Sequence, residues 1–262
     1  MIKNASPLII YEDEQIIVCH KPAGTPTQSS HIGTSDMESL LKNHLFSSRK
    51  FHRAKSGEPY LAIIHRLDQP VEGILVFAKT PAAAKELNRQ LTSQEFGKYY
   101  LAVISGIPEP QEGSLENYLV KDARTNSSAV CTKTTPGAKL ARLHYRTIEK
   151  YGAPGNEKFT DSKSTDTPKH TTRNQRQPPL QNESSALVEI HLDTGRHHQI
   201  RVQMAHFGHP LIGDRKYGKK ITDHMNSVQS STKRFQAGQL HLCAYKLTFR
   251  HPKTGKEMEF QI

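Results

Sequence analysis

Short apolar runs separated by polar turns predict strands along much of the chain. Residues 9–10 and 16–19 flank an acidic turn and predict two short strands near the start. The apolar runs at residues 60–64 and 74–78 have the length and composition of buried strands. Residues 65–72 are therefore expected to form a loop between two core strands, where a rigid scaffold can aim a side chain at a ligand.

Two segments have the spacing of amphipathic helices. Thr80 and Pro81 fit an N-cap and a first helical residue, and apolar residues follow at helical spacing until Gly97. A second helix is predicted to start at residues 194–196 and to bury one face up to Phe207, shortly before a glycine and a proline. Both helices are expected to pack on the core.

Strands outnumber helices in the rest of the pattern. Further strands are expected at residues 99–104, 141–145, 186–192 and 240–249, and after the turn at 252–255. A change of phase within residues 240–249 indicates a bulge. The order of elements predicts an α+β fold in which helices and loops flank a mixed, mainly antiparallel central sheet, and residues 1–262 are expected to form a single domain.

Two polar segments interrupt this pattern. Residues 152–185 contain Phe159 and Leu180 as their only large apolar side chains, which is too little to order a segment of this length. We therefore expect a flexible basic insertion there, with contact to RNA as its alternative role. Residues 218–238 are also polar and basic, and they are expected to form a mobile loop.

Composition adds the sign of the expected partner's charge. Lys and Arg number 36 against 25 Asp and Glu, a formal charge of +11 that suits a polyanion such as RNA. The 3 cysteines are widely spaced and predict neither a disulfide framework nor a zinc knuckle, which favours a reducing compartment. Because no targeting segment and no membrane-length apolar run is evident, a cytoplasmic location without membrane contact is expected.

Several separated motifs carry a specific resemblance. Residues 65–68 read HRLD, residues 98–102 read KYYLA, and residues 194–218 read TGRHHQIRVQMAHFGHPLIGDRKYG. In order and spacing, these segments and the strand at 240–249 resemble the RluA-type RNA pseudouridine synthases. The resemblance covers the chain from about Leu8 to Ile262, outside the two polar segments. It implies the pseudouridine synthase fold for the predicted sheet, and it leads us to expect a catalytic domain without an N-terminal S4-like module.

The resemblance also implies an activity. Enzymes of this family convert uridine in RNA to pseudouridine by cutting the N-glycosidic bond, rotating the uracil and rejoining it through carbon. The expected substrate is a specific uridine in structured RNA, with ribosomal RNA as the first expectation and transfer RNA as the second. A uracil inside a stem or a stacked loop must be flipped out before a buried side chain can reach it. No cofactor or nucleotide is required for this isomerisation.

Residue by residue, the resemblance implies roles at the motif positions. Asp68 would be the catalytic aspartate, Tyr100 the ring that stacks near the target base, and Arg201 the cationic partner of the aspartate. Arg66 would lie beside the flipped nucleotide. Other motif residues are expected to contact RNA, namely His65, Arg196, His198 and Gln199.

The residue types fit this chemistry. A carboxylate can add to the sugar or to the base, or assist removal of a proton from the sugar, and each route needs Asp68 ionised. A guanidinium at Arg201 favours that charged form and orients it. In an extended loop Arg66 and Asp68 share one side, consistent with both facing RNA. Alone, each of these side chains would more often be a loop ion pair or a packing residue.

Other readings are weighed against this one. The histidines near the second helix include His197, His198, His206 and His209, but no carboxylate or thiolate completes a metal set, so no metal is expected. An RNA hydrolase would need paired carboxylates, whereas Asp68 stands alone in its loop. The main alternative is a catalytically inactive, synthase-like protein that binds or folds RNA. Residues 69–72, QPVE, depart from the family pattern and put the path of the loop in question. The protein is expected to be a monomer.

Overall fold

The computed structural model describes residues 8–29, 33–47, 57–151, 184–218 and 238–262, and one eleven-stranded sheet runs through them. Its strands are β1 (Leu8–Glu12), β2 (Ile16–Lys21), β3 (Ala62–Ile63), β4 (Glu72–Ala78), β5 (Gly97–Ser105), β6 (Glu112–Asp122), β7 (Ser127–Cys131), β8 (Lys139–Tyr151), β9 (Ser185–Leu192), β10 (Leu242–Arg250) and β11 (Glu257–Gln261). The helices are α1 (Met37–Ser47), α2 (Pro81–Thr92) and α3 (Gln199–His206).

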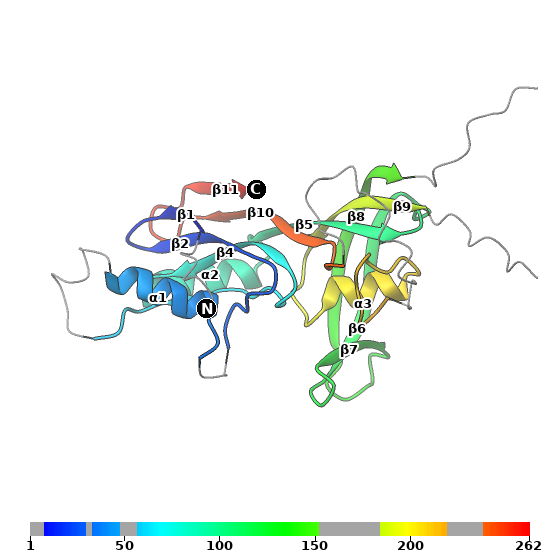
Figure 1. Cartoon of the computed structure of the whole chain (residues 1–262), viewed down its shortest axis with the longest axis horizontal. Helices are drawn as coiled ribbons and strands as arrows, with labels where there is room; N and C mark the ends of the chain where they lie inside the picture. Colours follow the sequence, from blue (N-terminus) through cyan, green and yellow to red (C-terminus); the bar gives the residue numbers. More distant parts are fainter. Residues whose placement is uncertain (1–7, 30–32, 48–56, 152–183, 219–237) are drawn as a thin grey trace, which may run out of the picture.

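The strand order is β1-β2-β4-β10-β5-β9-β8-β6-β7, with β11 paired to β10 and β3 paired to β4. Every pairing is antiparallel except that of β4 with β10. The predicted α+β class with a mixed, mainly antiparallel sheet is confirmed. Figure 1 shows two lobes on this sheet, one with α1 and α2 and the other with α3, and β5 passes between them.

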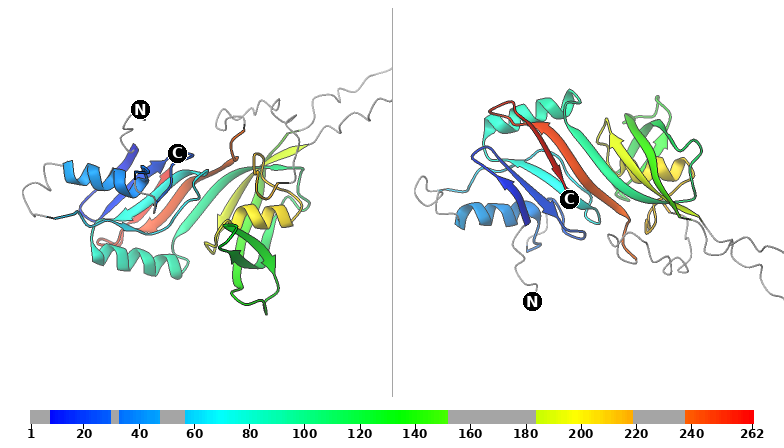
Figure 2. Two further views of the ribbon diagram at one scale, coloured as in Figure 1. Left: turned by 60° about the horizontal axis from the view of Figure 1, so that its bottom comes forward. Right: turned by 90° about the horizontal axis from the view of Figure 1, so that it is seen from above.

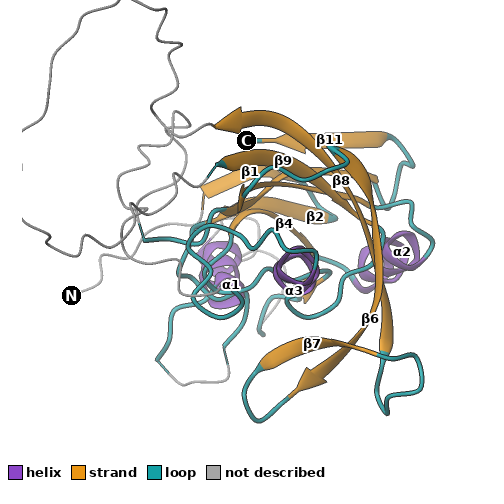
Figure 3. Ribbon diagram, turned by 90° about the vertical axis from the view of Figure 1, so that its right-hand side faces the viewer, coloured by secondary structure: helices purple, strands orange, loops and turns teal. Residues whose placement is uncertain are grey.

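Helices cover both faces of the sheet in the first lobe and one face of the sheet in the second lobe. Leu75 and Phe77 of β4 pack in one cluster with Leu41 of α1, whereas Ile74 and Val76 pack in another with α2. Figure 2 accordingly shows the strands of this lobe between α1 and α2. In the second lobe α3 lies within the curve of β6, β8 and β9 (Figure 3), and the cluster that contains α1 continues to Ile200 and Met204 of α3.

Most of the predicted elements are present with shifted ends. Thr80 is the N-cap of α2 and its hydroxyl accepts a hydrogen bond from the Ala83 amide at 3.1 Å, but the helix ends at Thr92, well before Gly97. The bulge predicted in β10 is confirmed, since its register with β5 shifts between Cys243 and Lys246. The strand expected at 60–64 is reduced to the two residues of β3.

Two further corrections concern helices and the polar segments. The segment at 194–198 is a turn, and α3 begins only at Gln199 because His198 has a left-handed backbone (φ 54°) that no helix continues. Helix α1 was not predicted, although Met37, Leu41 and Leu45 are buried at helical spacing. The segments 152–183 and 219–237 lie outside the described residues. Ser185, the last residue of the predicted insertion, belongs to β9 and is buried.

Candidate active site

A cleft with a volume of about 1210 Å³ lies between the loop after β3 and the turn before α3. Its lining includes residues 63–69 on one wall and residues 192–201 on the other, with Lys98 and Tyr100 of β5 between them. Residues 65–68, residues 194–201 and two residues of the motif at 98–102 therefore border one space. Strand β5 provides the floor because its residues 98 and 100 point to the same face of the sheet.

Asp68 is held by a loop that is tied down on both sides. Leu67 is buried and exchanges two hydrogen bonds with Thr27, at 3.1 and 3.2 Å, while Arg66 is exposed. The alternation predicted for this loop is thus observed. After Asp68, the carbonyl of Gln69 accepts hydrogen bonds from the amide of Gly24 at 2.8 Å and from Nζ of Lys21 at 3.1 Å.

Residues 69–72, which depart from the family pattern, take part in this anchoring. The side chain of Gln69 donates a hydrogen bond to the carbonyl of Gly24 at 3.0 Å, and the amide of Val71 donates to the carbonyl of Asp68 at 3.0 Å, closing a turn. Lys21 is fully buried and donates to three backbone carbonyls, those of Pro22, Thr25 and Gln69. The loop of this chain is therefore fixed by its own residues.

Arg201 has a nearer partner than the one we expected. Its guanidinium donates two hydrogen bonds of 2.8 Å to the carboxylate of Asp214, whereas its Nη1 lies 3.7 Å from Oδ2 of Asp68. Asp214 also accepts hydrogen bonds from the amides of Lys216 and Tyr217. Arg201 thus faces Asp68, as the predicted cationic partner of the aspartate would, and Asp214 is a second and nearer partner that the sequence did not indicate.

Burial dominates the electrostatics of Asp68. It raises the pKa of the Asp68 carboxyl above its ordinary value, against the opposing effects of the charges of Arg201 and Lys21. Arg201 does favour the ionised form, as we expected, but it shares its charge with Asp214. For Asp214 burial also acts to raise the pKa, and the hydrogen bonds and charge of Arg201 outweigh it, so this pKa is lowered.

His198 lies beside the aspartate. Its Nε2 is 3.5 Å from Oδ2 of Asp68, and its Nδ1 is 2.7 Å from the hydroxyl of Tyr217. Burial and the charge of Arg201 lower the pKa of His198 to about 3, so the ring is neutral at neutral pH. A neutral imidazole carries a proton on one of its two nitrogens, and Nε2 is the nitrogen that faces the Asp68 carboxylate.

Tyr100 faces the same space as Asp68. The ring is buried, with 7% of the residue exposed, and it lines the cleft between Asp68 and β10. Burial and the nearby carboxylate of Asp68 raise the pKa of the Tyr100 hydroxyl well above its ordinary range, so it stays protonated. The three residues expected to be catalytic, Asp68, Tyr100 and Arg201, are thus brought together.

The residues expected to contact RNA divide into two groups. Arg66 and Arg196 are exposed at the rim, and Nε of Arg196 donates a hydrogen bond to the carbonyl of Leu140 at 2.8 Å. Gln199 is buried, with 3% exposed, and bonds to Thr194, to the Arg196 amide and to the carbonyl of Arg142. We correct its expected role to that of a cap that holds the turn before α3.

His65 has a packing role in the structure. Its two ring nitrogens are buried and have no hydrogen-bond partner in the described part of the chain, and the ring packs edge-on against Phe96 at 5.5 Å. Burial and the charge of Lys98 lower its pKa to about 3. His65 also lines the cleft, so its contact with RNA stays a prediction, and the structure adds that its ring packs under the loop.

Sequence reasoning missed four side chains that hold the site. Asp214 and Tyr217 lie in the block at 194–218 that carried the resemblance, and Lys21 and Thr27 lie near the start of the catalytic domain. Among the described residues, no three His, Cys, Asp or Glu side chains are grouped as a metal ion requires. No helix within the described ranges is long and apolar enough to cross a membrane.

Comparisons with known proteins agree with this geometry. The family of RNA pseudouridylate synthases matches residues 15–206. The chain is 31% identical over 254 residues to a protein of Neisseria meningitidis named ribosomal large subunit pseudouridine synthase D, and the match covers 97% of this chain and 57% of that protein. It is also 31% identical to the protein of the same name from Zymomonas mobilis, covering 96% of this chain and 67% of the relative.

Solved structures show the same fold. The structure named Human RNA Pseudouridylate Synthase Domain Containing 4 superposes with a TM-score of 0.66 at 21% identity, covering 97% of this chain and 87% of that one. Human RNA Pseudouridylate Synthase Domain Containing 1 gives 0.62 at 18% identity, with coverage of 99% and 84%. With its motifs gathered in one cleft, its sequence matched over residues 15–206 and its fold shared, this chain belongs to the RNA pseudouridylate synthase family, as its resemblance to the RluA-type enzymes indicated.

Proposed function

We propose that this chain isomerises uridine to pseudouridine in structured ribosomal RNA. The observation that carries the proposal is Asp68, a carboxylate that is largely buried yet open to the cleft, with Tyr100 on the floor and Arg201 at 3.7 Å. The relatives from Neisseria meningitidis and Zymomonas mobilis are named for the ribosomal large subunit, which supports ribosomal over transfer RNA as substrate.

The reaction exchanges one bond for another at C1′ of the ribose. The N1–C1′ bond breaks, the C5–C1′ bond forms, N1 gains a proton and C5 loses one. Asp68 acts as the ionised carboxylate near C1′, and Arg201 with Lys21 stabilises that charge against burial. The neutral ring of His198 lies 3.5 Å from Oδ2, the same carboxylate oxygen of Asp68 that Arg201 faces.

The cleft accepts one nucleotide taken out of its stack. Tyr100 supplies an aromatic surface at the floor, which compensates for stacking that the uracil loses. Arg66, exposed on the opposite wall, is placed to enter the space that the base leaves. With these roles, the protein recognises RNA structure when the base is flipped out, and not during the bond exchange that follows.

The proposal includes a monomer that uses no nucleotide cofactor and works in the cytoplasm. Supporting this location, all three cysteines lie in the described part of the chain and none forms a disulfide, as a reducing compartment requires. The chain spans 57% of the length of the Neisseria relative that it matches.

Tritium release tests the proposal. Large-subunit ribosomal RNA transcribed with [5-³H]uridine loses tritium when C5 bonds to the ribose. We expect release by the wild type and by Glu259→Gln, a control that removes an exposed carboxylate on β11, and none by Asp68→Asn. Filter binding should show RNA affinity of Asp68→Asn within a few-fold of wild type, because phosphate contacts dominate binding. No release by the wild type would support an inactive RNA-binding protein instead.

A further inference from the structure

Lys98 is a buried cation that the proposed reaction does not use. Only 7% of the residue is exposed, and it lines the cleft two residues before Tyr100 on the same face of β5. Among the described residues its Nζ has no hydrogen-bond partner and no carboxylate within 4.0 Å. Lysine is rarely buried without a partner, because an ammonium loses favourable hydration when it leaves water.

The surroundings of Lys98 do not neutralise it. Asp193 is the acidic group that acts on the Lys98 pKa, and its carboxylate pairs with His144 at 3.1 Å and with His191 at 3.7 Å. The other charged neighbour is Arg196, a second cation, and His65 beside it is neutral. Lys98 and Arg196 are thus neighbouring cations in the cleft, and an anion between them would relieve their repulsion.

The chain leaves space for such an anion. A Cβ on Gly195 would lie 3.5 Å from Nζ of Lys98, in van der Waals contact with it, so a side chain at this position would occupy space beside the ammonium. With glycine there, the ammonium borders the cleft directly. Arg196, the next residue, is exposed at the rim of the same wall.

We propose that Lys98 and Arg196 form a phosphate subsite for the RNA strand that carries the target uridine. The inference rests on the proposed function for the identity of the strand. Lys98 and Tyr100 are two residues apart on one strand, or roughly 7 Å, which is within the length of one nucleotide. A stacked base at Tyr100 therefore brings a backbone phosphate next to Lys98. A neutral uracil carbonyl would leave both cations unneutralised, so a phosphate is the better ligand.

The proton on Lys98 gives the subsite a pH signature. Burial lowers the pKa of Lys98 to about 8, with Asp193 opposing this effect and Arg196 adding to it. A bound phosphate favours the charged form, so RNA binding should be strong below pH 8 and weaken as the pH rises through that value. Lys21 has a pKa lowered to about 8 as well, but it is unchanged in every variant below.

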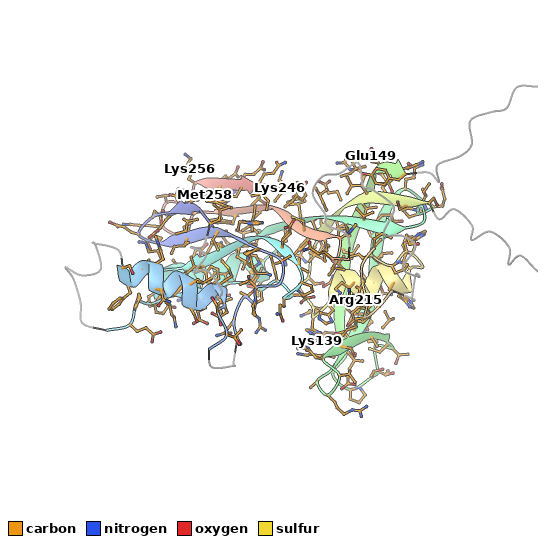
Figure 4. The ribbon with its side chains drawn as sticks, viewed as in Figure 1. Lys139, Glu149, Arg215, Lys246, Lys256 and Met258 are labelled. Carbon is orange, nitrogen blue, oxygen red and sulfur yellow. The ribbon has the colours of Figure 1, made fainter. Side chains whose placement is uncertain are left out.

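Four variants test the subsite by filter binding of the ³²P-labelled ribosomal RNA transcript. Lys98→Met should bind about 10-fold more weakly than wild type, with a slope of log K against log salt that is smaller by about 0.7–0.9. Lys98→Arg should bind within about 3-fold of wild type and lose less affinity than wild type between pH 7 and 9, because arginine stays charged there while Lys21 still titrates. Gly195→Ala, which keeps the charge but places a methyl group beside it, should weaken binding in the same direction as Lys98→Met. Lys256→Met, on the lobe opposite α3 (Figure 4), should leave the slope and pH profile unchanged.

Stability separates this role from a structural one. Removing an unpartnered buried charge should leave the melting temperature of Lys98→Met equal to or above that of wild type. A lower melting temperature, wild-type binding by Lys98→Met, or no rescue by arginine would overturn the subsite. The tritium assay distinguishes the two proposals. If wild type releases tritium but Lys98→Met binds RNA as wild type does, only the subsite is refuted. If Lys98→Met changes the salt slope but wild type releases no tritium, only the synthase proposal is refuted.

Discussion

Replacing Asp214 by asparagine removes the carboxylate that holds Arg201 in the cleft. The pair is buried, with 9% of the Arg201 side chain and 1% of the Asp214 side chain exposed, and it is joined by two hydrogen bonds of 2.8 Å. Removing one partner of a buried ion pair leaves the other charge uncompensated, at a cost of about 3–5 kcal/mol. For a chain of this size that lowers the melting temperature by roughly 6–20 °C.

Asparagine keeps one oxygen that can accept from the amides of Lys216 and Tyr217, so the turn itself should survive. Urea unfolding followed by circular dichroism measures the free energy of unfolding. Glu259→Gln is the matched control, because it breaks an exposed pair with Lys246 that contributes at most about 1 kcal/mol.

A double-mutant cycle assigns the loss to the pair. Arg201→Met combined with Asp214→Leu should cost less than the sum of the single changes, since neither leaves a lone charge when both are replaced. The reasoning fails if the free energies of unfolding of Asp214→Asn and Glu259→Gln agree within about 1 kcal/mol. It also fails if the effects of Arg201→Met and Asp214→Leu are additive. In either case Asp214 does not hold Arg201.

Two other changes test the packing around the site. The pKa of His65 is about 3 in the folded state and near its ordinary 6.5 in the unfolded state, so the unfolded state binds one more proton between these pH values. The free energy of unfolding therefore falls as the pH is lowered from 6.5 to 3. In urea titrations, His65→Leu should reduce this pH dependence by the contribution of one proton. Gly73 has φ 141° and a Cβ there would overlap the backbone of Ala244, so Gly73→Ala should cost about 3 kcal/mol, and a thermal melt unchanged from wild type would refute the contact.

The periodic parts of the fold were predictable because buried positions are occupied by apolar residues at strand or helix spacing. The run at 74–78 became β4, whose residues fill two cores, and the Thr80–Pro81 signal placed the start of α2 correctly. The hairpin of β6 and β7 was missed, since most of its residues are exposed or half-buried and show little apolar pattern.

The site was predictable only as far as the motifs reach. Asp68, Tyr100 and Arg201 were named from the resemblance and do lie together in one cleft. The pairing of Arg201 with Asp214 spans a helix and a turn, and no spacing rule signals it. Gln199 was expected to face RNA because it belongs to a motif, but a motif also conveys residues that only support the backbone.

Strand β5 is hydrogen-bonded to β10 of one lobe and to β9 of the other, so it joins the two walls of the cleft through continuous backbone. Spreading or closing those walls by a hinge would break ladder bonds that no loop replaces. We therefore expect the cleft to keep its shape when RNA binds. Deformation on binding therefore belongs to the nucleic acid, and sequences that unstack easily should be favoured as substrates even where the protein touches none of their bases.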